Sequence, residues 1–216
     1  MSELPILDGP RIEPEDGNVE KLVILCHGYG SNGDDLIGLV PHIKPYMKNA
    51  VFVSPNAPER VMGLPNGYQW FPLTNLSREE RLTGTIAAAP TLQNFIDQEL
   101  KRYGLEDKDV VLIGFSQGTM MCLHVALRRK HDIAGVVGFS GAMTLPENWK
   151  DKVTSKPPIM LIHGERDDVV PIELMHQAFI ALQEIGVNVD NHVSPAVMHS
   201  IGPDGLHKAI EFLVKL

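Results

Sequence analysis

The 216-residue chain is poor in cysteine and contains no long apolar run. Its two cysteines, Cys26 and Cys122, each lie within an apolar segment, where reduced cysteine commonly serves as a small core residue. We therefore expect no disulfide and a reducing, cytoplasmic location. No apolar run approaches the roughly 20 residues that span a bilayer, and no segment resembles an export signal. Stable membrane insertion is not expected.

Basic residues are also too few to suggest a nucleic-acid partner. The chain carries 19 Lys and Arg against 27 Asp and Glu, a net charge of −8, whereas phosphate binding needs clustered cations. The one dense basic run, Arg128-Arg129-Lys130, follows an apolar helical pattern. Cations suit the negative end of a helix dipole, so we interpret this run as a helix end.

Length and composition are typical of one globular domain over residues 1–216. Short apolar runs that end at Gly, Pro, Ser or polar residues predict central strands. These runs cover 21–27, 51–54, 110–114, 135–139 and 159–163, with a last strand at about 187–193. Helical spacing predicts helices near 92–103, 119–127, 174–185 and 205–216, the first starting late or kinked because of Pro90. The alternation predicts an α/β fold, a mostly parallel sheet covered on both faces.

The motif Gly114-Phe115-Ser116-Gln117-Gly118 lies between a predicted strand and a predicted helix. A turn this tight forces Ser116 into a strained conformation and lifts its Oγ clear of the sheet. The flanking glycines remove Cβ atoms that would collide. Free N–H groups at the start of the helix favour a developing oxyanion, so the Gln117 amide is the first expected donor, with no role required of its side chain. This pattern predicts a serine nucleophile.

A serine nucleophile needs a base, which in turn needs an orienting acid, and in this architecture the acid precedes the histidine. Of the histidines after Ser116, only His199 lies in a loop between the last predicted strand and helix. The others fall in helical or strand patterns, or, like His131, in a polar connection that precedes any acid-bearing loop. They are His124, His131, His163, His176, His192 and His207. His199 is therefore the predicted base.

The loop after the predicted strand 159–163 supplies the acid. Glu165 could pair with Arg166 on the surface, and Asp168 could cap the following helix. Spacing alone leaves Asp167 and Asp168 as equal candidates.

A glycine loop after the first strand, His27-Gly28-Tyr29-Gly30, lets the backbone approach the nucleophile. We predict that the Tyr29 amide is the second oxyanion donor. His27 is expected to be structural, with its ring hydrogen-bonded inside the loop.

From about Lys21 to its C-terminus the chain resembles the phospholipase/carboxylesterase family, which includes acyl-protein thioesterases and small bacterial carboxylesterases. The resemblance rests on motifs spread along the chain. They are residues 27–36, 55–58, Trp70-Phe71, 114–118, 139–141, His163-Gly164 with Asp167, and Val170-Pro171. It implies the α/β-hydrolase fold without a large cap, and no metal or organic cofactor.

The resemblance also implies Ser116 as nucleophile, His199 as base and, three residues after the glycine of the His-Gly pair, Asp167 as acid. It implies backbone donors at Tyr29 and Gln117. The expected substrate is a small acyl ester or an acylated protein, and the expected assembly is a monomer or homodimer. One departure is Met198, where family members usually have Gly before the catalytic histidine.

Residues 57–85 form a predicted long loop that is rich in Pro, Gly and large apolar side chains. Such loops are often lids or binding walls, so we predict that Met62, Leu64, Trp70 and Phe71 line an acyl pocket. The alternative is a surface excursion packed by its own aromatics. For function, the alternatives to an esterase or thioesterase are peptidase or lysophospholipase action at the same site, and a catalytically silent binding module.

Overall fold

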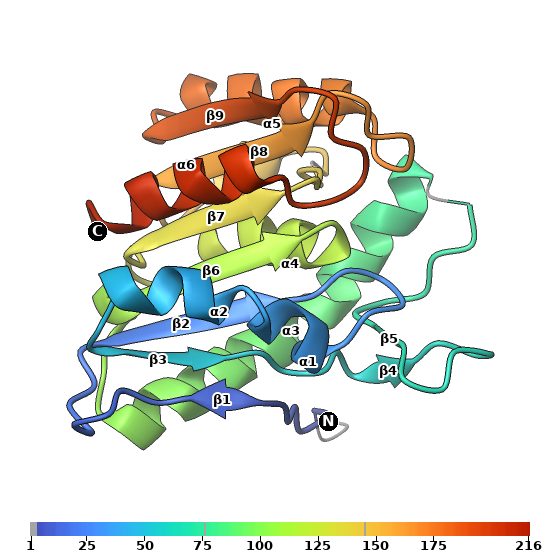
Figure 1. Cartoon of the computed structure of the whole chain (residues 1–216). Helices are drawn as coiled ribbons and strands as arrows, with labels where there is room; N and C mark the ends of the chain where they lie inside the picture. Colours follow the sequence, from blue (N-terminus) through green and yellow to red (C-terminus); the bar gives the residue numbers. More distant parts are fainter. Residues whose placement is uncertain (1–3, 76, 145) are drawn as a thin grey trace.

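The computed structural model describes residues 4–75, 77–144 and 146–216. A seven-stranded sheet with the order β1-β3-β2-β6-β7-β8-β9 lies between two layers of helices (Figure 1). Its strands are β1 (Arg11–Ile12), β2 (Lys21–Cys26), β3 (Ala50–Val53), β6 (Val110–Phe115), β7 (Gly135–Phe139), β8 (Ile159–Gly164) and β9 (Val189–Ser194). Only β1 pairs antiparallel among these described strands, which confirms the predicted mostly parallel sheet.

Helices cover both faces of the sheet, as the alternating pattern predicts (Figure 1). One layer contains α3 (Arg78–Tyr103), α4 (Gln117–Ala126) and α5 (Ile172–Glu184). The other contains α1 (Gly33–Ile37), α2 (Val40–Ile43) and α6 (Pro203–Leu213). Short 3-10 turns occur at Lys44–Tyr46, Asp107–Asp109 and Trp149–Lys152. None of the helices in the described ranges has the length and apolarity that crossing a bilayer requires.

The sheet separates two apolar cores. On β2, Leu22 and Ile24 pack into the core beneath α3 and α4, whereas Val23 and Leu25 pack against the opposite layer. All four are fully buried, because successive side chains of a strand point to opposite faces. Full burial of one such side chain contributes about 1.5–3 kcal/mol. A continuous apolar run is therefore what a strand covered on both faces requires.

Helix α3 differs from the prediction, because it begins at Arg78 and contains Pro90 in its interior. Its start is fixed by Ser77, whose Oγ accepts a hydrogen bond from the Glu80 amide at 3.1 Å. The helix ends at Gly104, which adopts a left-handed φ of 68°. Proline removes one backbone hydrogen bond, and Leu92, Phe95 and Ile96, which follow it, are buried in the core.

The predicted loop over 57–85 is accordingly wrong in part. Its last residues form the first two turns of α3, and its beginning contains a two-stranded antiparallel ribbon, β4 (Glu59–Arg60) and β5 (Tyr68–Gln69). The ribbon lies beside the carboxyl ends of the central strands (Figure 1).

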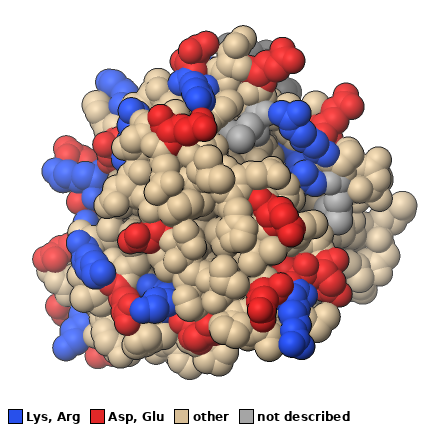
Figure 2. All heavy atoms as spheres, turned by 90° about the horizontal axis from the view of Figure 1, so that it is seen from above, with Lys and Arg blue, Asp and Glu red and all other residues tan. Residues whose placement is uncertain are grey.

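The predicted helix-end role of the basic run agrees with its contacts. Arg128 donates to the His124 carbonyl at 3.0 Å, near the C-terminus of α4. Arg129 forms ion pairs with Asp97 and Asp107. On the face shown in Figure 2, basic and acidic side chains are interspersed rather than gathered in a basic patch.

The parallel strands bring their carboxyl ends to one edge of the sheet, where ligands bind in open α/β folds. Residue pairing places Cys26 beside Gly114, and Phe115 beside Phe139. The loops that follow β2, β6, β8 and β9 therefore meet there, and these loops contain the predicted site residues.

Candidate active site

Ser116 occupies a strained turn between β6 and α4, with φ 53° and ψ −114°. Its amide donates to the Phe139 carbonyl at 2.9 Å, which anchors the turn to β7. The flanking glycines are sterically required. A Cβ at Gly118 would lie 1.8 Å from the Cys26 carbonyl oxygen, and one at Gly114 would lie 2.5 Å from the Thr119 nitrogen. Strain of this kind persists only where surrounding contacts hold it.

His199 meets Ser116 from the loop between β9 and α6. Its Nε2 lies 3.0 Å from the Ser116 Oγ, although the two residues are 83 positions apart. The Phe115 ring packs beside the imidazole, with centroids 4.9 Å apart. Packing against Phe115 and the strained turn thus hold the His199 imidazole and the Ser116 hydroxyl within hydrogen-bond distance.

The His199 loop is itself tied to the loop after β8. The Arg166 amide donates to the Val197 carbonyl at 2.9 Å, and the Glu165 carboxylate accepts from the Ala196 amide at 2.9 Å. Glu165 therefore contacts the backbone of the His199 loop, whereas a surface pair with Arg166 was the expectation.

Asp167 lies on the other side of the imidazole. Its Oδ2 and Oδ1 are 2.8 and 3.0 Å from the His199 Nδ1, and its side chain is fully buried. Oδ1 also accepts from the amides of Val170 at 2.8 Å and Val169 at 3.0 Å. Burial opposes ionisation, but the hydrogen bonds from His199 and the two amides outweigh it and lower the pKa of Asp167. The neighbouring Asp168 is exposed, and the His199 Nδ1 is hydrogen-bonded to both Asp167 oxygens.

His163, a buried histidine discounted as a base because it lies in a strand pattern, contacts Asp167. Its Nε2 lies 2.8 Å from the Val170 carbonyl oxygen and 3.3 Å from the Asp167 Oδ2. Burial lowers the pKa of His163, against the opposing effects of Val170 and Asp167, so the ring is neutral near pH 7. Because both neighbours are acceptors, the proton belongs on Nε2. The His163-Gly164 pair was the available signal in the sequence.

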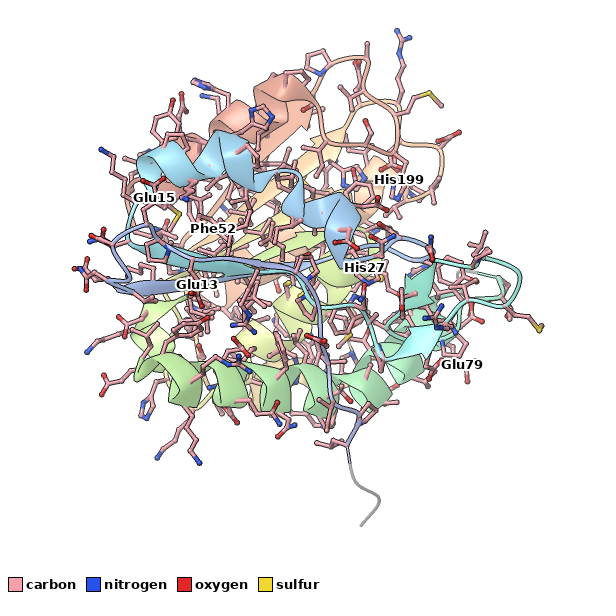
Figure 3. All side chains as sticks on the ribbon, turned by 60° about the horizontal axis from the view of Figure 1, so that its bottom comes forward. Glu13, Glu15, His27, Phe52, Glu79 and His199 are labelled. Atoms are coloured by element: carbon pink, nitrogen blue, oxygen red, sulfur yellow. The ribbon has the colours of Figure 1, made fainter. Side chains whose placement is uncertain are left out.

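The Tyr29 and Gln117 amides are available to an added acceptor. Within the described residues neither amide has a hydrogen-bond acceptor. The loop that contains Tyr29 lies close against Ser116, since a Cβ at Gly28 would lie 3.3 Å from the Ser116 Cβ. Figure 3 shows His27, next to this loop, and His199 at the same end of the sheet.

His27 is structural, as predicted. Its Nδ1 donates to the Gly28 carbonyl at 2.7 Å, and its Nε2 accepts from the Ala57 amide at 2.9 Å. Burial is the largest cause of its lowered pKa, so the ring remains neutral near pH 7.

A cavity of about 320 Å³ opens beside Ser116. It is lined by Tyr29, Leu73, Thr74, Ser116, Met120, Val169, Val170 and His199. Leu73, Met120, Val169 and Val170 make part of this lining apolar.

The four residues predicted to line an acyl pocket lie elsewhere. Met62 is 98% exposed and Leu64 is 46% exposed, both in the connection between β4 and β5. Trp70 and Phe71 are buried in the core, 1% and 2% exposed. The Trp70 indole and backbone amide donate hydrogen bonds to His27 and Gln117, which hold Trp70 in the core. Apolar character alone therefore did not indicate where Trp70 lies.

Met198, the departure from the family pattern, leaves the cavity open. Its side chain is 54% exposed and does not line the cavity. Its backbone lies against the end of β8, where a Cβ at Gly164 would come within 2.3 Å of the Met198 carbonyl oxygen.

The described residues contain no group of three or more His, Cys, Asp or Glu placed to hold a metal.

Residues 7–216 match the family described as Phospholipase/Carboxylesterase. The chain belongs to this family. Acyl-protein thioesterase 1 of Gibberella zeae is 28% identical over 95% of this chain and 94% of its own length. Esterase YpfH of Escherichia coli is 28% identical over 93% of this chain and 83% of its own length.

Solved structures agree with this assignment. The crystal structure of esterase PE8 superimposes with a TM-score of 0.94 and 39% identity, covering 97% of this chain and 98% of that one. The carboxylesterase of Bacillus cereus, at 18% identity and a TM-score of 0.80, shares the fold. The predicted α/β-hydrolase fold and family are confirmed, and with them an enzyme of the ester-hydrolase class.

Proposed function

We propose that this chain is a serine carboxylesterase or thioesterase that hydrolyses acyl esters or thioesters through Ser116, His199 and Asp167. The observation that carries the proposal is the chain of contacts from the Ser116 Oγ to His199, 3.0 Å, and from His199 to Asp167, 2.8 Å. This is the order in which a nucleophile, its base and an orienting acid must stand.

In the proposed reaction, His199 Nε2 takes the Ser116 proton as Oγ attacks the acyl carbonyl carbon. The Asp167 carboxylate stabilises the resulting imidazolium, which donates its proton to the leaving alcohol or thiol. The carbonyl oxygen becomes an oxyanion that accepts hydrogen bonds from the Tyr29 and Gln117 amides, each such donor contributing about 10²–10³ in rate. Water then attacks the Ser116 acyl-enzyme with His199 again as base; the acyl–Oγ bond breaks, the imidazolium returns its proton to the Ser116 Oγ, and the acid is released.

The cavity beside Ser116 supports a small or medium acyl group as the substrate portion that is bound. Its volume, about 320 Å³, is at the lower end of small-molecule pockets, about 300–1,000 Å³. Leu73, Met120 and Val170 supply apolar surface there. The names of the thioesterase relatives make an acylated protein a candidate substrate alongside small esters.

Hydrolysis of p-nitrophenyl acetate and butyrate by the wild type and by Ser116→Ala tests the proposal. We expect wild-type turnover and loss of nearly all of it in the variant. Equal rates from both proteins would overturn it. A panel of thioesters and lysophospholipids of graded chain length, with the same variant as blank, separates thioesterase from lysophospholipase action. A silent binding module would bind these ligands without turnover that depends on Ser116.

A further inference from the structure

The two amides assigned to the oxyanion belong to segments that are far apart in sequence. Tyr29 follows β2, and Gln117 begins α4. An oxyanion is stabilised only when both donors lie about 2.7–3.1 Å from it, and a displacement of 1 Å can cost about 10²-fold in rate. The spacing between the segments must therefore be held by other residues.

Trp70 is hydrogen-bonded to both segments. Its indole Nε1 donates to the His27 carbonyl at 3.0 Å, two residues before Tyr29. Its backbone amide donates to the Gln117 Oε1 at 2.8 Å. Trp70 is 1% exposed and Gln117 is fully buried, so water does not compete for these bonds.

The Gln117 side chain is fixed by a second bond. Its Nε2 donates to the Phe71 carbonyl at 2.8 Å, while its Oε1 accepts from the Trp70 amide. Turning the amide over would set oxygen against oxygen and N–H against N–H, so only one orientation satisfies both partners. Gln117, whose backbone amide is assigned to the oxyanion, is thereby hydrogen-bonded through its side chain to Trp70 and Phe71.

His27 is hydrogen-bonded to both ends of the segment formed by residues 57–71. The ring accepts from the Ala57 amide at 2.9 Å, and the His27 carbonyl accepts from the Trp70 indole. The backbone after His27 is paired as well, because the Gly30 amide donates to the Tyr68 carbonyl at 2.8 Å and the Tyr68 amide donates to the Ser31 carbonyl at 2.8 Å. Residues 57–71 are thus hydrogen-bonded to the backbone on both sides of Tyr29 and to the Gln117 side chain.

We propose that Trp70 and the Gln117 side chain are positioning residues that set the separation of the Tyr29 and Gln117 amides. This inference rests on the proposed function for its kinetic consequence. Neither side chain lines the cavity, so neither is a catalytic residue through its side chain. Their effect is transmitted through the backbone of the two donors.

The test compares Trp70→Phe, which removes the indole N–H and keeps a buried ring, with Gln117→Met, which keeps size and the backbone amide. Steady-state hydrolysis of p-nitrophenyl butyrate should show kcat reduced by about 10–100-fold in each, with KM changed by less than about threefold. The double variant should lose much less than the product of the two single losses, because both act on one geometry.

Phe52→Leu is the matched control. Phe52 is a fully buried aromatic in the core on the other face of the sheet. It should lower the melting temperature while kcat stays within about twofold. If kcat in all three variants instead follows the melting temperature, the positioning role is wrong.

Amide resonances give a readout that does not depend on turnover. In ¹H–¹⁵N spectra the Tyr29 and Gln117 amide peaks should shift in Trp70→Phe and stay in place in Phe52→Leu. Unmoved peaks with unchanged kcat would overturn the inference, as would a change confined to KM. If wild type and Ser116→Ala hydrolyse the ester equally, the proposed function fails, and the peak shifts still decide whether Trp70 positions the two amides.

Discussion

Asp167 holds the Nδ1 atom of His199 against both of its carboxylate oxygens, at 2.8 and 3.0 Å. Two backbone amides fix the carboxylate in turn. This contact selects the imidazole tautomer with a proton on Nδ1, which leaves Nε2 free to accept the serine proton.

Asp167→Asn should therefore lower kcat by up to about 10⁴-fold, because an amide favours the wrong tautomer. Asp168→Asn should stay within about twofold of wild type, since Asp168 is exposed. Hydrolysis of p-nitrophenyl butyrate by both variants checks the ranking. The reverse order would transfer the acid role to Asp168.

Replacing His163 should weaken both the fold and the site. His163→Leu leaves the Val170 carbonyl unpaired in the core, a loss of about 1–3 kcal/mol in the free energy of unfolding. It should also lower kcat, because Val170 and Asp167 belong to one hydrogen-bonded loop. Urea unfolding and kcat are measured together, with His163→Gln as the variant that keeps an N–H donor. Loss of stability with unchanged kcat would show that His163 does not support Asp167.

Filling the cavity should change chain-length preference. Leu73→Trp places a larger side chain in the cavity. The kcat/KM for p-nitrophenyl octanoate divided by that for p-nitrophenyl acetate should therefore fall about 10–100-fold. Met62→Trp, at a side chain 98% exposed, is the control and should leave that ratio unchanged. A shift in the control and none in Leu73→Trp would relocate the acyl site to the β4–β5 connection.

The free energy of unfolding should fall as the pH falls, because buried histidines of the folded chain have lowered pKa values. Burial, and secondarily the charges of Arg128 and Lys152, lower the pKa of His124 to about 4. Between pH 6.5 and 4 the unfolded chain binds a proton that the folded chain does not, so stability falls as the pH falls through this window. The loss attributable to His124 is up to about 3 kcal/mol.

Guanidinium unfolding of His124→Leu at pH 7 and pH 4.5 measures that loss. The variant should lose less stability than wild type between the two pH values, with a remaining slope from His27 and His163, whose pKa values are also lowered. Met121→Leu, at a buried residue of the same helix without a titratable group, should retain the wild-type slope. Equal slopes in wild type and His124→Leu would contradict the assignment.

The central strands and the strained turn at Ser116 were predictable because their signals are local. A strand buried on both faces needs a continuous apolar run, and β2 lies at Lys21–Cys26 within the predicted 21–27. The start of α3 is also locally encoded, by Ser77 and Glu80, whereas Pro90 removes only one backbone hydrogen bond and does not delay the start of the helix.

Features that depend on distant partners were not predictable. Trp70 looks like a pocket wall by composition, yet its position follows from bonds to His27 and Gln117, 43 and 47 residues away. Glu165 contacts the Ala196 amide 31 residues later, and nothing near Glu165 in the sequence signals that contact.

A covalent acyl group on Ser116 is the most direct test of the proposed reaction. The wild type is mixed rapidly with p-nitrophenyl butyrate, quenched in acid within one turnover and digested for peptide mass spectrometry. We predict a butyryl group on Ser116, and no acylated peptide from Ser116→Ala treated in the same way. Product formation without that adduct, or an adduct on another residue at the same rate in both proteins, would contradict catalysis through Ser116.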